Sequence, residues 1–108
     1  MSHTSKLSAA ELRTLRNLFP SLPESYFIHL YMVGWGELKN GRIIHQSPNL
    51  PNSIYPNIKV DHILILGDDS MGFCFGYDTV SKHFGEFDGR GIWTEDPSND
   101  AFNSYVTL

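Results

Sequence analysis

The hydrophobic pattern of this chain changes character once, at Gly34-Trp35-Gly36. Before this point apolar residues recur at the three- and four-residue spacing of helices, and after it they form short runs divided by turn residues, as in strands. Helical spacing returns in residues 99–108, through Phe102, Tyr105 and Val106. This order of helical and strand patterns predicts an α+β fold: a single mixed or largely antiparallel sheet with N-terminal helices and a short C-terminal helix packed on it.

Two helices are expected in the first third of the chain. Ser8 and Glu11 form a capping box, and the helix that they open is predicted to stop near Leu18. The run Ser21-Leu22-Pro23-Glu24 repeats the capping pattern, so a second helix is expected to about Met32, with Gly34 as its C′ residue. Its aromatic residues are expected to be buried against the sheet, namely Tyr26, Phe27 and Tyr31.

Turn residues divide the second part of the chain into strand candidates. The clearest hairpin joins Ile58–Leu66, which is rich in β-branched residues, to Gly72–Tyr77 through the turn Gly67-Asp68-Asp69-Ser70. Residues 46–57 contain three prolines and three asparagines and are expected to be a loop. Further strands are expected at Arg42–His45, Lys82–Phe87 and Gly91–Trp93.

The length of 108 residues indicates one domain, residues 1–108, and an apolar fraction of 41% is enough to fill a single core. Cys74 is the only cysteine, so neither an internal disulfide nor a cysteine zinc site can form within the chain. The N-terminal residues lack a signal-peptide pattern, and no run approaches the about 20 apolar residues of a membrane span. We therefore expect a soluble, cytoplasmic protein.

Charge is distributed unevenly along the chain. Residues 1–60 contain six lysines and arginines and three acids, whereas residues 61–108 contain two and nine. An acidic surface of this kind steers a basic protein partner and repels nucleic acid. Aspartate is also a good turn residue, so the acids can equally have collected in turns. Both interpretations stay open at this point.

Four ordered features resemble the SUKH superfamily, whose yeast members regulate cell-wall synthesis. They are an amphipathic first helix, the motif LPESY (Leu22–Tyr26) opening a second helix, the hairpin ILILGDDSMGFCFGYD (Ile63–Asp78) and a closing aromatic helix in AFNSYV (Ala101–Val106). The chain departs from the family in having Gly34-Trp35-Gly36 and then Asn40-Gly41 where an Asn-Gly-Gly-like turn is usual. The resemblance implies a mixed α+β domain and, as in bacterial members, an immunity protein of a polymorphic toxin system that inhibits by binding.

The expected function is therefore non-catalytic: a protein that neutralises a cognate toxin domain, for example a nuclease, by direct binding. The basic surface of a nuclease would suit an acidic rim on this chain, with an exposed tryptophan, Trp35 or Trp93, as an anchor. Burial of both tryptophans in the core is the alternative. A regulatory or scaffold domain without a toxin partner is the alternative function, and a small hydrolytic enzyme is a further one. The candidate partner-binding residues are Asp68, Asp69, Asp78, Glu86, Asp88 and Trp35.

Residue spacing gives little support to catalysis. His29 has no acid or histidine at i+4, and Asp61 and His62 are adjacent on a strand, so their side chains face opposite sides. Cys74 alternates with Phe73 and Phe75, and no nearby histidine activates it. The loop of residues 67–72 lacks the ligand pattern of a calcium loop, and no dinucleotide or Walker motif occurs. We expect no catalytic residue, metal or cofactor.

Overall fold

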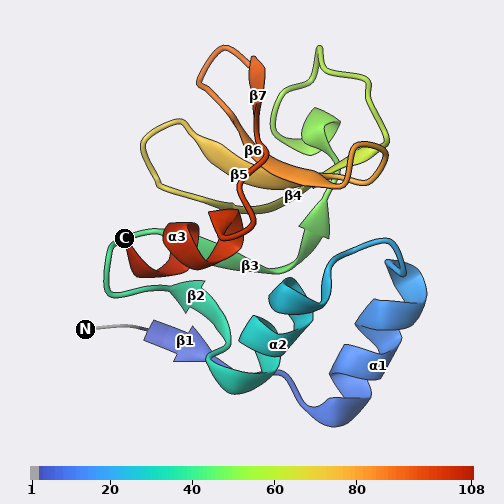
Figure 1. Ribbon diagram of the computed structural model, residues 1–108, viewed down its shortest axis with the longest axis vertical. Coiled ribbons are helices and arrows are strands. Elements are labelled where there is room, and N and C mark those ends of the chain that lie inside the picture. Colours follow the sequence, from blue (N-terminus) through green and yellow to red (C-terminus); the bar gives the residue numbers. More distant parts are fainter. Residues whose placement is uncertain (1–2) are drawn as a thin grey trace.

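A single antiparallel sheet organises the computed structural model, which describes residues 3–108 (Figure 1). Its seven strands lie side by side in the order in which they occur in the chain, so the predicted α+β class and largely antiparallel sheet are confirmed. The strands are β1 (His3–Ser5), β2 (Trp35–Glu37), β3 (Ile43–Asn49), β4 (Ile63–Asp68), β5 (Cys74–Asp78), β6 (His83–Phe87) and β7 (Trp93–Asp96). The helices are α1 (Ala9–Leu18), α2 (Glu24–Met32), the short 3₁₀ turn η1 (Pro51–Ser53) and α3 (Ala101–Thr107).

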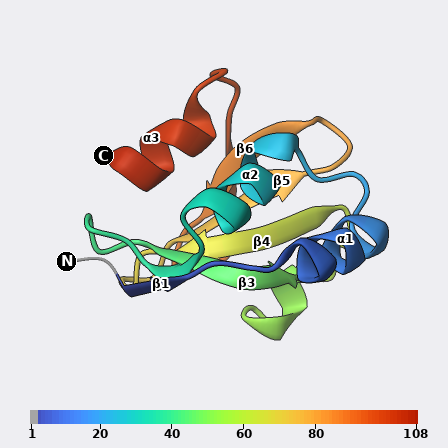
Figure 2. The same ribbon diagram turned by 90° about the horizontal axis from the view of Figure 1, so that it is seen from below.

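Each face of the sheet is covered by different parts of the chain. Figure 2 shows α2 and α3 on one side of the strands and the segment around η1 on the other. On the helix side, Phe75 of β5 stacks on Tyr105 of α3 with ring centroids 4.1 Å apart. On the opposite side, Tyr55 packs against Phe87 at 5.4 Å. The alternation of strand side chains thus supplies two cores, one under the helices and one under residues 50–62.

Helix α1 begins as its sequence predicts. Ser8 Oγ accepts from the Glu11 N–H at 3.1 Å, and Glu11 Oε1 accepts from the Ser8 N–H at 2.9 Å, so the capping box is confirmed. The predicted end of α2 near Met32 is also confirmed, with Gly34 as its C′ residue: Gly34 has φ of +108° and donates its N–H to the His29 carbonyl at 2.8 Å. Within residues 3–108, no helix is both long and apolar enough to cross a membrane.

The second capping box is wrong. Helix α2 begins at Glu24, with Pro23 as an N-cap that has no side-chain hydrogen bond, so Ser21 lies two residues outside the cap. Leu22 donates its N–H to the Phe19 carbonyl and buries its side chain, which fixes the turn between α1 and α2 by other means. Glu24 pairs instead with Arg16 of α1.

Several strand boundaries differ from the prediction. Strand β3 continues to Asn49 through the segment expected to be a loop, and its pairing with β4 is irregular between Ile44 and Asn49. This irregularity tolerates Pro48, which has no N–H to donate to a ladder. Conversely, β4 starts at Ile63, because Ile58 and Val60 pack against the second core outside the ladder.

Strands β1 and β2 were not expected as strands. Their pairing depends on Gly36, because a Cβ at that position would lie 2.3 Å from the His3 carbonyl oxygen. Only glycine therefore lets the two backbones approach so closely.

Candidate functional site

The acids predicted to form a charged rim do not lie together. Asp68, Asp69 and Asp88 lie at one end of the sheet, where the β4–β5 and β6–β7 turns meet. Asp78 lies at the opposite end, where β5 turns into β6. Glu86 lies within β6 on the helix side, opposite Phe75. The structure therefore gathers three of the five acids and separates the other two.

Two of the gathered acids hold hairpin turns together. One oxygen of Asp69 accepts from the N–H groups of Met71 and Phe73, at 2.8 and 3.1 Å. Asp88 does the same for Arg90 and Ile92, at 2.8 and 3.0 Å. The Ile92 N–H is the main cause of the lowered pKa of Asp88. These contacts are those of aspartates that stabilise turns.

Asp68 is tied to a neighbouring strand. Its Oδ2 lies 2.7 Å from His45 Nε2, and its Oδ1 accepts from the Ser70 N–H at 2.9 Å. The other ring nitrogen of His45 lies 3.3 Å from the Asn49 side-chain nitrogen. Both nitrogens of His45 are thus engaged, which leaves neither to act as a base for Cys74.

The expectation that Asp78 lies on an exposed rim is wrong, because this residue exposes only 7% of its surface. Its Oδ1 accepts from the N–H groups of Val80 and Ser81 at 2.8 and 3.1 Å. Burial acts to raise the pKa of Asp78, but donation from these N–H groups and the nearby His62 outweigh it, so the pKa lies below its ordinary value. Asp78 therefore stabilises the β5–β6 turn.

Both tryptophans pack on the protein. Trp35 is half-buried against the core under the helices. Trp93 lies across the paired glycines of β5 and β6: a Cβ on Gly85 would lie 2.7 Å from its ring, and one on Gly76 would lie 3.3 Å away. Its ring also contacts Phe87, with centroids 5.0 Å apart. The opposed glycines are the sequence signal that could have located this ring.

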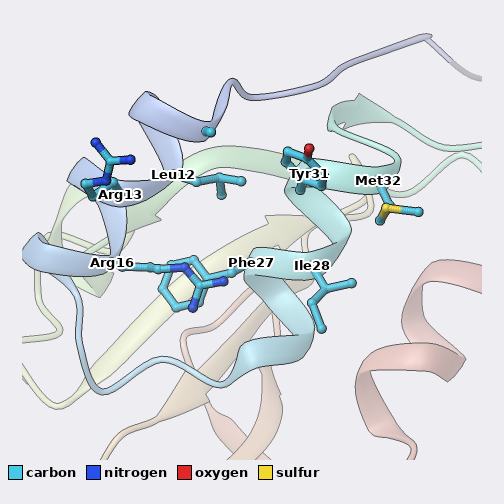
Figure 3. A pocket seen from close by; sticks show the side chains of 8 residues that line it. Leu12, Arg13, Arg16, Phe27, Ile28, Tyr31 and Met32 are labelled. Carbon is cyan, nitrogen blue, oxygen red and sulfur yellow. The ribbon is translucent and has the colours of Figure 1, made fainter.

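The groove between α1 and α2 was missed in the sequence. Figure 3 shows Leu12 and Phe27 in its floor, and the groove has a volume of about 490 Å³. Ile28, Tyr31 and Met32 of α2 line it while exposing 53%, 52% and 61% of their surfaces. The predicted burial of Tyr26 and Phe27 is confirmed, and that of Tyr31 is wrong. Neighbouring apolar side chains exposed in this way are typical of interaction surfaces.

Helix α1 contributes two arginines to the groove. Arg16 donates to Glu24 at 2.6 Å, and its guanidinium lies 4.7 Å from the centre of the Phe27 ring. Over the part of the chain that the structure describes, Arg13 forms no ion pair, so its positive charge is uncompensated. Among residues 3–108, the groove is therefore apolar, with Arg13 as the one unpaired cation at its edge.

Among the described residues, the side chains that could take part in catalysis do not form a nucleophile hydrogen-bonded to a base. Cys74 is buried, and burial raises the pKa of its thiol, which keeps it in the unreactive form. Ser81 donates its hydroxyl to Glu95 at 2.7 Å, and His83 lies 3.2 Å from the other oxygen of that carboxylate. Serine and histidine thus share one acid, but no bond joins them. No cluster of three or more potential metal ligands occurs among residues 3–108.

No protein-family model matches this chain, and neither a curated protein nor a solved structure matches it. The resemblance to the SUKH superfamily therefore rests on the four landmarks alone.

Proposed function

We propose that this chain is a non-catalytic, SUKH-like binding protein of the cytoplasm that neutralises a toxin domain by direct contact. The observation that carries the binding function is the exposed apolar wall of α2, formed by Ile28, Tyr31 and Met32 over the floor of the α1–α2 groove. Exposing these side chains to water is unfavourable, and a partner that covers them gains the free energy of their burial.

The SUKH part of the proposal is supported by the fold. The LPESY motif precedes and opens a helix that packs on an antiparallel sheet, and Ile63–Asp78 contains the β4–β5 hairpin at the centre of that sheet. The closing helix packs its aromatic side chains on the same face. These are the relationships that the resemblance implies.

Two surfaces would contribute differently to toxin binding. The acidic second part of the chain would accelerate the approach of a basic toxin domain, such as a nuclease, at low ionic strength. The α1–α2 groove would hold the complex together, because buried apolar anchors supply most of the affinity of protein interfaces. The partner is therefore expected to insert an apolar side chain into the groove, with a carboxylate near Arg13.

The test is whether a large toxin gene lies directly upstream, and whether the chain rescues bacterial cells that express the C-terminal domain of its product. The chain should restore growth, and Met32→Glu should abolish rescue and weaken binding at least about thirtyfold. Val80→Glu is the matched control, because Val80 exposes 75% of its surface in the turn between β5 and β6 and lines neither the α1–α2 groove nor the groove between α2 and α3. Glu86→Lys tests whether the acidic surface steers the toxin domain, and it should lower the association rate constant. Among residues 3–108 the Glu86 side chain forms no hydrogen bond, so this substitution breaks none.

Failure of the unaltered chain to bind or rescue would overturn the immunity function. Equal loss with Met32→Glu and Val80→Glu would remove the groove from the proposal. The second candidate function is a regulatory or scaffold domain, and the same exposed wall supports it. A regulatory or scaffold function predicts that the gene has no adjacent toxin gene. It also predicts that the chain binds another protein partner and that Met32→Glu abolishes this binding.

A further inference from the structure

His29 is a buried polar side chain, and one of its ring nitrogens has no partner among the residues that the structure describes. It lies on α2 and exposes 8% of its surface, and its Nε2 atom is shielded from solvent. No group among residues 3–108 forms a hydrogen bond with this nitrogen. Buried polar atoms are nearly always paired, so an unpaired ring nitrogen indicates a place where a partner can be accepted.

This histidine lines a second groove, between α2 and α3, with a volume of about 760 Å³. The size is that of a small-molecule site, and apolar side chains dominate the lining. The His29 ring packs edge-on against Phe102 of α3, with centroids 5.6 Å apart. Further apolar residues of the lining are Met32, Val33, Leu38, Phe84 and Val106.

The state of the ring defines what it can bind. Burial lowers the pKa of His29, and the backbone of Gly34 offsets only part of this effect, so the ring is neutral at pH 7. A neutral imidazole has one N–H, and its other nitrogen is an acceptor. Nε2 is that acceptor in the tautomer that carries its proton on Nδ1.

We propose that the α2–α3 groove binds a small, uncharged and largely apolar molecule that donates one hydrogen bond to His29 Nε2, such as a phenol or an indole. The charged residues of the lining, Lys39 and Asp100, are exposed to solvent, and the apolar side chains that surround His29 favour an uncharged ligand. Because Nε2 is shielded from solvent, a ligand has to displace part of the lining to reach it. Met32 lines the groove and exposes 61% of its surface, and its unbranched side chain can turn aside to admit a ring. The groove shares Ile28 and Met32 with the α1–α2 groove, but its binding of a small molecule can be measured without a toxin domain.

The test uses 4-methylphenol as probe and toluene as the analogue that lacks the hydroxyl. In NMR titrations of the full chain, 4-methylphenol should produce saturable shifts at the Val106 and Leu38 methyl groups and at His29 Nε2. It should bind at least about tenfold more tightly than toluene, as one hydrogen bond to a buried acceptor predicts. In His29→Phe the two probes should bind equally. His62→Phe is the control, since His62 is a histidine outside the groove.

Equal affinity of the two probes for the unaltered protein would overturn the proposal, and so would the absence of saturable shifts. The His29 Nε2 resonance of the unaltered chain gives a readout that does not depend on the stability of any variant. A resonance that stays unchanged while the methyl groups shift would show that the groove binds without the histidine, which also contradicts the proposal.

Discussion

Replacing Tyr105 by phenylalanine should destabilise the protein through the loss of one hydroxyl. This buried hydroxyl lies 3.0 Å from the Ile43 carbonyl oxygen and 2.8 Å from that of Asp68, so its hydrogen is shared between β3 and β4. Burial raises the pKa of Tyr105, which keeps the hydroxyl protonated as a donor. The ring keeps its stacking on Phe75, because phenylalanine has the same ring.

The expected loss is about 1–2 kcal/mol, the typical cost of removing a donor from buried acceptors. With a urea m-value of about 1–3 kcal/mol/M for a small protein, the unfolding midpoint should fall by about 0.3–2 M. The assay is urea unfolding followed by circular dichroism, with an unchanged m-value as evidence that the denatured state is the same.

Tyr77→Phe is the matched control for this measurement. Tyr77 is equally buried at 7% exposure, but within residues 3–108 its hydroxyl forms no hydrogen bond. Its loss should therefore be smaller than that of Tyr105→Phe. Equal midpoints for the two variants would refute the hydrogen-bond argument, because both substitutions remove the same atom from the same kind of ring.

Three further predictions follow from buried or crowded positions. Because the pKa of Asp78 is lowered, its stabilising contribution is present above the ordinary value of 3.8 and is lost as pH falls through the folded-state pKa. The urea midpoint of Asp78→Asn should therefore lie below that of the unaltered protein at pH 7, and this difference should shrink towards pH 3. Gly85→Ala should lower the free energy of unfolding by about 1–3 kcal/mol and change Trp93 fluorescence, because its Cβ would lie 2.5 Å from the Thr94 carbonyl oxygen. Gly89→Ala is the control: its Cβ would have no atom of another part of the described chain nearer than 3.8 Å, so it should have little effect in the same unfolding assay. The Cys74 thiol should react with a disulfide reagent far more slowly in the native protein than in urea, and equal rates would contradict its burial.

The features that could be predicted from the sequence are those set by neighbouring residues. The Ser8 and Glu11 capping box and the Gly34 helix end depend on backbone groups a few residues away, and both are present. The box at Ser21 failed because Pro23 takes the N-cap position. Strand β1 escaped prediction because its polar residues carry no hydrophobic alternation, and its partner is separated from it by two helices.

The candidate site was harder to predict for a related reason. Aspartates that stabilise a turn and aspartates that bind a partner protein both occur at turn positions in a sequence. The roles of Asp69 and Asp88 therefore became clear only from the N–H groups that donate to them. The exposure of Tyr31 depends on which side of α2 the sheet covers, and helical spacing alone does not define that side when apolar residues surround the helix.

The strictly sequential strand order has a consequence for how the protein folds. From β2 to β7 each strand pairs with the next one along the chain, so these ladders have low contact order and form without long loop closures. Strand β1 is the exception, because residues 6–34, including both N-terminal helices, separate it from β2. Closing this loop costs more conformational entropy than any hairpin in the sheet. We therefore expect the β1 edge to be the last ladder to pair during folding and the first to open.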